Sequence, residues 1–177
     1  MLDRGFGEEN VDGYKWAQWR KSRSGAGALS RPFIMEVTTT EENESVIIPT
    51  NGLGYDYTAK SSDGQEFNDV TGDQEFIFAN IGVYTISISG LFPQIYINDG
   101  VDALNFTDIK QFGDVVWSSF DRSFFGASNL TGSFTDAPNL SNVTNMRLVF
   151  RSCILFNQDL NLWDVSSVTD MSLMFRA

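Results

Sequence analysis

Four acidic side chains in one turn-rich stretch carry oxygen atoms of the kind that bind cations. They are Asp63, Glu66, Asp69 and Asp73. Calcium takes oxygen ligands from loops of this type, which makes Asp63, Asp69 and Asp73 candidate metal ligands. The strict spacing of a calcium-binding loop is absent, however. A solvated acidic turn is therefore the better interpretation, and we expect no bound metal and no other cofactor.

The rest of the composition removes most catalytic chemistry. The 177-residue chain has no histidine, which excludes histidine general bases and histidine metal sites. Its single cysteine, Cys153, excludes an internal disulfide framework and is expected to be a small buried hydrophobe. A facing carboxylate pair needs a cleft, and nothing in the sequence predicts one. We therefore expect no enzymatic activity.

The charge and hydropathy of the chain limit its partners. The net charge is -11, and the hydrophobic content of 42% is enough for a packed core. An acidic field repels nucleic-acid phosphates and anionic membranes, so neither is an expected partner. No stretch is long enough to span a membrane, and no apolar run near Met1 resembles a signal peptide.

The C-terminal third of the chain repeats itself. The segment 143–151 returns as 168–176, with Val, Thr, Met, Leu, Phe and Arg recurring at a constant offset of 25. A period in the twenties is typical of a solenoid, in which one short unit stacks on the next. Phe125 precedes Phe150 by the same offset and indicates a degenerate first unit. We therefore expect residues 99–177 to form a degenerate unit and two repeats, truncated at the C-terminus.

Each unit is expected to contain a short strand, a turn and a short helix. Apolar residues at i, i+3, i+6 and i+7 predict helices over 143–150 and 168–175. Residues 160–165 are predicted to be a strand with Trp163 and Val165 facing inward. Pro138 and Leu140 occupy the matching earlier positions.

Residues 32–98 read as strands separated by turns. The alternation in 83–89 places Tyr84, Ile86 and Ile88 on one face, and the pattern favours a small antiparallel β-sandwich. Residues 1–31 read as a lead-in or linker whose Trp16 and Trp19 dock on the next domain. The predicted strands are 33–39, 46–48, 55–57, 75–79, 83–89 and 94–98.

The repeat resembles a known family. Phe156-Asn157-Gln158-Asp159-Leu160, the run 163–172 and Met174-Phe175 resemble the repeat of BspA-type leucine-rich-repeat surface proteins. The preceding section resembles a polycystic-kidney-disease-type (PKD-like) β-sandwich, although its usual Trp-Gly-Asp-Gly turn is here Ser61-Ser62-Asp63-Gly64. The implied fold is mainly β with short helices: a small antiparallel sandwich, then the start of a leucine-rich-repeat-like solenoid.

The resemblance implies a cell-surface or secreted protein used in adhesion, with a protein or glycan as its partner. Inward Trp163 and Val165 would leave an outward ladder of polar residues, and we expect Asp136, Asn139, Asn161 and Asp164 to form a binding face. A merely solvated face is the simpler alternative. A rival function is a carbohydrate-binding or accessory module of a secreted enzyme, in which exposed Tyr55, Tyr57, Trp16 or Trp19 stack on sugars; a structural spacer is the third.

The repeat leads to a stability prediction. Phe125, Phe150 and Phe175 are expected to stack in one column, with Phe150 more buried than Phe175. Phe150→Ala should then cost about 3–5 kcal/mol in the free energy of unfolding, as large core truncations do. Asp63→Asn should cost well under about 1 kcal/mol. Thermal melts of the two variants test this, and the reverse order would indicate a metal at the acidic turn.

Overall fold

The computed structural model describes residues 31–176. The chain divides into two units, Met1–Ser30 and Arg31–Ala177. The predicted docking of Trp16 and Trp19 concerns residues outside the described range. The described unit is mainly β. Its helical content is a single 3-10 turn, η1 (Ala103–Asn105).

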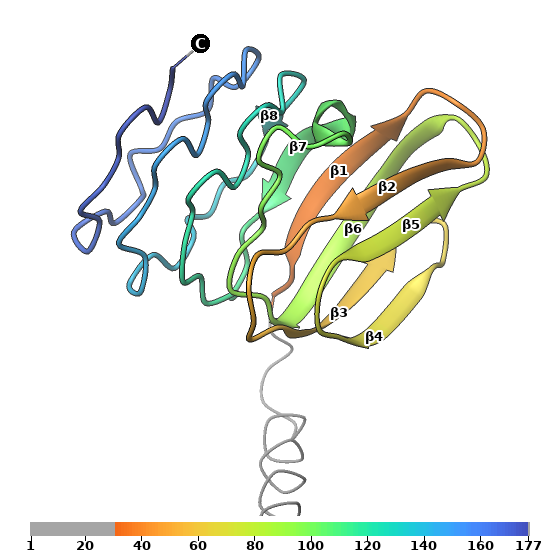
Figure 1. The fold of residues 1–177 in the computed structure, drawn as a ribbon, viewed down its shortest axis with the longest axis horizontal. Coiled ribbons are helices and arrows are strands. Elements are labelled where there is room, and N and C mark those ends of the chain that lie inside the picture. The colour runs from red at the N-terminus through yellow and green to blue at the C-terminus, as the bar shows by residue number, and fades with distance from the viewer. Residues whose placement is uncertain (1–30, 177) are drawn as a thin grey trace, which may run out of the picture. The chain divides into compact units, whose positions relative to one another are not determined.

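Six strands form the larger sheet (Figure 1). Its order is β4-β3-β6-β1-β7-β8, and all pairs are antiparallel except β7 with β8, which are parallel. The bounds are β1 (Phe33–Thr39), β3 (Asp56–Ser61), β4 (Glu66–Val70), β6 (Gly82–Leu91), β7 (Phe106–Gln111) and β8 (Thr131–Gly132).

Two further strands, β2 (Glu44–Ile48) and β5 (Gln74–Phe78), pair antiparallel in a second sheet. This sheet packs on one face of the larger one through aromatic rings. The Phe78 and Tyr84 ring centroids lie 4.1 Å apart, and those of Phe67 and Phe76 lie 5.2 Å apart. Neither sheet closes on itself. The core between the layers is therefore built from both sheets.

The period-2 pattern determines which face of each strand is buried. In β1, Phe33, Met35 and Val37 are buried and the residues between them are half-exposed. In β6, Ile86 and Ile88 are fully buried and Tyr84 packs against the core. The predicted orientation of this strand is confirmed. Alternation works here because successive side chains of a strand point to opposite faces.

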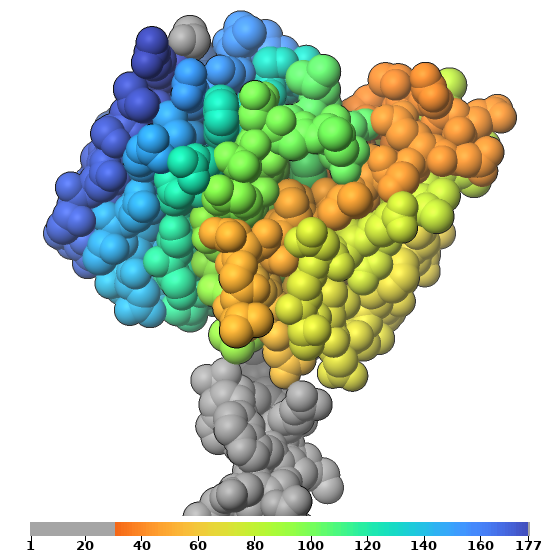
Figure 2. Space-filling model, viewed as in Figure 1, coloured from red at the N-terminus to blue at the C-terminus, as the bar shows by residue number. Residues whose placement is uncertain are grey.

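Beyond β7 the chain runs in segments joined by a ladder of backbone hydrogen bonds. The N–H groups of Phe120, Arg122, Phe124 and Gly126 donate to carbonyls of the next segment, at 2.9–3.0 Å. Met146, Leu148, Phe150 and Ser152 donate in the same way to carbonyls of the segment that follows theirs, at 2.8–3.0 Å. The segments lie side by side in sequence order, and Figure 2 shows them as adjacent bands from green to dark blue.

The predicted helices over 143–150 and 168–175 are wrong, because these segments are turns. In the first segment Met146, Leu148 and Phe150 N donate to the neighbouring segment. In both segments other N–H groups close short turns, such as Val149 N to Met146 O and Met174 N to Met171 O, so no i→i−4 ladder forms. Leu148 and Leu173 also have positive φ angles of 61° and 58°. A right-handed helix requires a φ near −60°.

Two predicted strands are also absent. Residues 94–98 and 160–165 have no regular strand structure, although Ile95, Ile97 and Trp163 are buried. In the first stretch the N–H groups donate to loop carbonyls, such as Tyr96 N to Pro49 O at 3.1 Å. Trp163 is buried as predicted, but the alternation did not predict the strand partner, which periodicity alone cannot supply.

An aromatic column does form, but its first member is Phe124 and not the predicted Phe125. Phe150 stacks between Phe124 and Phe175, with ring centroids 5.5 Å and 5.8 Å away. Phe125 instead lies under the Arg151 guanidinium, 5.0 Å from it. The first unit is one residue longer than the second, so the constant offset selected the wrong ring. Phe150 is 2% exposed and Phe175 62% exposed, which confirms the predicted order of burial.

The two-layer part and the segments that follow share one core. Strand β7 pairs with β1, so the larger sheet continues past the expected boundary at residues 98 and 99. Phe33 of β1 packs against Trp117 and Phe112, with ring centroids 5.1 Å and 6.0 Å away. The ladder therefore begins on a rigid, buried sheet edge. Within the described part of the chain, no helix has the length and apolar character needed to cross a membrane.

Gly126 provides a test of how closely the segments approach one another. Its φ is +85°, and a Cβ there would lie 2.7 Å from the Asp99 Cα. Gly52 has the same φ of +85° with nothing within 4 Å of its position. Gly52→Ala should cost about 1 kcal/mol from backbone strain alone. Gly126→Ala should cost about 1–3 kcal/mol more, as overpacking does. Equal losses in denaturant melts would contradict the close approach.

Candidate interaction surface

Asn139 and Asp164 occupy equivalent positions in neighbouring segments, and both are exposed. The side-chain oxygen of each residue accepts hydrogen bonds from the residue two positions later and so closes a turn. Asn139 Oδ1 accepts hydrogen bonds from Ser141 N at 3.2 Å and Ser141 Oγ at 2.8 Å. Asp164 Oδ1 accepts from Ser166 N at 3.1 Å. The repeated polar residue is therefore held in a fixed geometry while its remaining atoms face solvent.

Contacts on both sides of these turns hold the two segments together. Gln158 Nε2 donates to Phe134 O at 3.0 Å, and Thr169 N donates to Thr144 O at 2.9 Å. Hydrogen bonds from Ser166 lower the pKa of the Asp164 carboxyl below its usual value. Asp164 consequently keeps its negative charge at any pH above the ordinary aspartate range.

The carboxylate of Asp136 is occupied by structural hydrogen bonds. Its carboxylate accepts hydrogen bonds from Arg31 Nη2 at 2.7 Å, Phe112 N at 3.1 Å and Gly113 N at 2.9 Å. The Asp136 side chain is only 15% exposed. It ties the start of β1 to the loop after β7. Asp136, one of the residues expected in the binding face, is thus held by these hydrogen bonds.

Asn161 has the accessibility that Asp136 lacks. It is exposed, and its side chain makes no hydrogen bond to any of residues 31–176. Its backbone N–H donates to Asp159 Oδ1 at 2.8 Å, which orders the turn before Trp163. Trp163 itself is 8% exposed and inward, as predicted. Val165, predicted inward, is 39% exposed within residues 31–176, which differs from the prediction. The accessible polar set is thus Asn139, Asn161 and Asp164.

A second repeated pair was missed by the sequence reasoning. Asn145 Oδ1 accepts from Arg147 N, and Asp170 Oδ1 accepts from Ser172 N, both at 2.9 Å. The backbones of Asn145 and Asp170 form a parallel bridge. The signal was present, since this Asn and this Asp are separated by the offset of the repeat. Asx turns therefore recur at several places in these segments. For this reason an Asx turn at Asn139 or Asp164 is weaker evidence for a binding site.

Two of the three candidate metal ligands, Asp63 and Asp73, make separate local contacts. Asp63 accepts from Ser61 Oγ and from Gln65 Nε2 at 2.8 Å. Asp73 accepts from Thr50 N and Oγ1, each at 2.7 Å. Asp69 has a φ of 54° in β4. Across residues 31–176, no three His, Cys, Asp or Glu side chains meet in a geometry that could hold a metal ion.

The tyrosines of the rival carbohydrate-binding hypothesis are buried. Tyr55 is 4% and Tyr57 1% exposed, and their hydroxyls donate to Gln94 O at 3.0 Å and Gly72 O at 2.7 Å. Burial raises the pKa of both hydroxyls. Neither ring can stack on a sugar. Trp16 and Trp19, the other two aromatics of that hypothesis, lie outside the described residues.

Cys153 is half-buried between segments, close to the predicted small buried hydrophobe. Its thiol donates to Phe124 O at 3.0 Å. Burial raises the pKa of this thiol to about 12, so the nucleophilic thiolate is scarce at neutral pH.

Comparison with known proteins identifies one similarity. Residues 97–177 match a family model described as "Mycoplasma protein of unknown function, DUF285". No curated protein and no solved structure matches the chain. The matched region begins just before β7 and includes all the segments joined by the hydrogen-bond ladder.

The Asx turn predicts different costs for two nearby asparagines. Asn139→Ala removes a side-chain acceptor from two donors and should cost about 1–2 kcal/mol in the free energy of unfolding. Asn142 is also exposed but makes no side-chain hydrogen bond within residues 31–176. Asn142→Ala should therefore stay within about 0.5 kcal/mol. Urea melts provide the comparison, and an equal effect would mean that the Asn139 turn contributes nothing.

Proposed function

We propose that this chain is a non-enzymatic cell-surface or secreted protein that mediates adhesion by binding a protein or glycan. In this proposal residues 99–176 are the start of a BspA-type leucine-rich-repeat solenoid, and the two-layer β part is the PKD-like sandwich that precedes it. The hydrogen-bond ladder, which joins equivalent places of successive segments, supports the solenoid. The match of residues 97–177 to a single family model supports treating these segments as one unit.

One observation carries the proposal. Asn139 and Asp164 stand at the same place in successive segments, exposed and fixed by their turns. Neighbouring parallel segments lie about 4.8 Å apart, so such residues form a regularly spaced polar row. A rigid row of this kind loses little conformational entropy when a partner binds. Addition of further segments would lengthen the row without changing its spacing.

The charge of the row favours certain partners. In this row, hydrogen bonds from Ser166 lower the pKa of the Asp164 carboxyl. The whole chain is acidic, with a net charge of -11. Complementarity therefore favours a basic protein surface, or a glycan that offers hydroxyl groups to Asn and Asp side chains. Acidic polymers are disfavoured by the same field.

The test uses variants that leave the turns intact. Asp164→Asn keeps the capping oxygen but removes the charge, and Asn161→Lys changes a side chain with no hydrogen bond within residues 31–176. Glu42→Lys, another exposed position, is the matched control for added charge. The proteins are tested on a glycan array and a panel of basic extracellular proteins. The proposal expects about tenfold weaker binding for Asn161→Lys and Asp164→Asn together, with Glu42→Lys unchanged.

Each alternative gives a different result in that test. Wild-type binding that all variants retain would place the site elsewhere on the chain. The absence of binding by the wild-type protein to every probe would favour the structural spacer. Melting temperatures of all variants are measured in parallel, so that loss of binding through unfolding is recognised.

A further inference from the structure

The loop between β2 and β3 contains the single Asn-Gly pair of the sequence, Asn51-Gly52 (Figure 1). An asparagine side chain carries an amide carbon that the backbone nitrogen of the next residue can attack, which closes a succinimide ring. A side chain on the next residue hinders this approach, and glycine has none. The pair therefore has a reactive sequence, provided that the fold leaves both groups free.

Both reacting groups are free in the structure. Asn51 and Gly52 are exposed. Neither the Asn51 side-chain amide nor the Gly52 N–H makes a hydrogen bond to any of residues 31–176. A Cβ at Gly52 would have nothing within 4 Å. The space around the Gly52 nitrogen is therefore open to the Asn51 side chain.

The rest of the loop is held at one end and open in the middle. The Tyr55 hydroxyl accepts from Asn51 N at 3.0 Å and donates to Gln94 O at 3.0 Å. Residues 51–54 are all exposed, and the two glycines among them have positive φ angles of 85° and 97°. Glycines in a short exposed loop give the backbone the freedom that ring closure needs.

Two Asp-Gly pairs provide an internal comparison, because an aspartate side chain can close the same ring with loss of water. In residues 31–176 these pairs are Asp63-Gly64 and Asp99-Gly100. Gly64 N donates to Ser61 O at 3.1 Å, and Gly100 N donates to Ile97 O at 2.8 Å. Attack by either nitrogen would break that hydrogen bond. Among these three pairs, only Asn51-Gly52 has a free attacking nitrogen.

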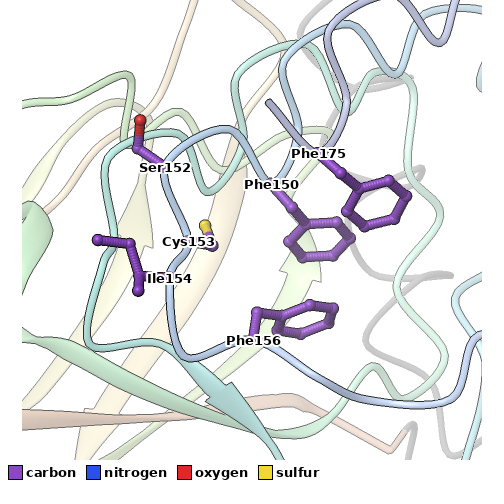
Figure 3. Close-up of a pocket in the computed structure, with 6 residues that line it drawn as sticks. All are labelled: Phe150, Ser152, Cys153, Ile154, Phe156 and Phe175. Atoms are coloured by element: carbon purple, nitrogen blue, oxygen red, sulfur yellow. The ribbon is translucent and has the colours of Figure 1, made fainter. Parts of the chain in front are cut away.

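Cys153 is a second side chain with spontaneous chemistry, the oxidation of its thiol. It lies at a groove that Phe150, Phe156 and Phe175 also line (Figure 3). Burial raises the pKa of this thiol to about 12. The thiolate is the form that oxidises, so the fold protects Cys153. The Asn51 side chain has no comparable protection.

We propose that Asn51 is a modification site that deamidates spontaneously, through a succinimide formed with Gly52, to isoaspartate and aspartate. Gly52 N loses its proton to solvent hydroxide and forms a bond to Asn51 Cγ. The bond from Cγ to Nδ2 breaks, and ammonia leaves. Water then opens the ring, at the backbone carbonyl carbon to give isoaspartate or at Cγ to give aspartate. The net reaction consumes water and releases ammonia, and it needs no oxidant.

Both products place a new carboxylate in an acidic loop. The neighbouring Thr50 donates to Asp73 Oδ1 through its N and Oγ1, each at 2.7 Å. In isoaspartate the chain continues through the former side chain. The Asn51 carbonyl, whose oxygen lies 3.3 Å from Tyr55 Oη, then becomes a carboxylate outside the main chain. The modification thus changes the link between β2 and β3, and it is independent of the proposed function.

The 177-residue protein and a synthetic peptide of residues 46–56 are incubated side by side in mildly alkaline buffer. Mass spectrometry of proteolytic peptides follows the reaction, and chromatography separates isoaspartate from aspartate. The proposal expects Asn51 to deamidate before any other asparagine of residues 31–176, with isoaspartate as the larger product. The rate in the folded protein should lie within about tenfold of the rate in the peptide, because the loop is open.

Two glycine variants test the role of the attacking nitrogen. Gly52→Ala should slow deamidation by about tenfold or more, because a Cβ hinders the nitrogen and restricts the backbone. Gly54→Ala is the matched control, since Gly54 also has a positive φ and nothing within 4 Å of a Cβ. This control should react as the wild type does. Thermal melts show that both variants are folded.

Any of three results contradicts the proposal. A rate in the folded protein more than about tenfold below that of the peptide would mean that the fold protects Asn51. Equal rates in the wild type and Gly52→Ala, or aspartate as the sole product, would mean that Gly52 N is not the attacking group. Isoaspartate at Asp63 or Asp99 as early as at Asn51 would show that a hydrogen-bonded glycine N–H gives no protection.

Discussion

The structure depends on two alternating hydrogen-bonding roles of successive backbone N–H groups. In residues 120–126 and 146–152 one set donates to the neighbouring segment and groups between them close local turns. Buried backbone groups are thereby satisfied without regular helices or long strands. Positive φ angles at Arg122, Leu148 and Leu173 are the local cost of this arrangement, because L-residues disfavour that region. The side chains of Leu148 and its neighbours offset that cost by packing against the adjoining segment.

The ladder is anchored by the sheets. Strand β7 is paired with β1 on one side and β8 on the other, so the antiparallel sheet passes directly into parallel pairing. A line of aromatic contacts accompanies this transition, from Phe33 through Trp117, Phe120 and Phe124 to Phe150. Since a short segment cannot bury its own apolar face, each one depends on the segment before it. The sheet edge therefore supplies the surface on which the first segment packs.

This dependence links structure to the proposed interactions. Turn-capping residues such as Asn139 and Asp164 project outward because the apolar residues between them are needed inside. The last segment exposes Met171, Leu173 and Phe175 because nothing within residues 31–176 lies beyond it. The polar surface is thus a by-product of how segments close their turns.

The sequence by itself determined the period and most strands of the two-layer part, although it missed β4 and predicted a strand over 94–98 that does not form. Those features follow from local alternation and from spacing, as in β1 and β6. Only the tertiary structure decided that the repeats are turns instead of helices, because an i, i+3, i+7 pattern does not reveal where each N–H donates. It also decided that Phe124 joins the column and that Asp136 is held by Arg31, since both depend on register between segments. Register is set by long-range packing, and a repeat read along one chain cannot contain it.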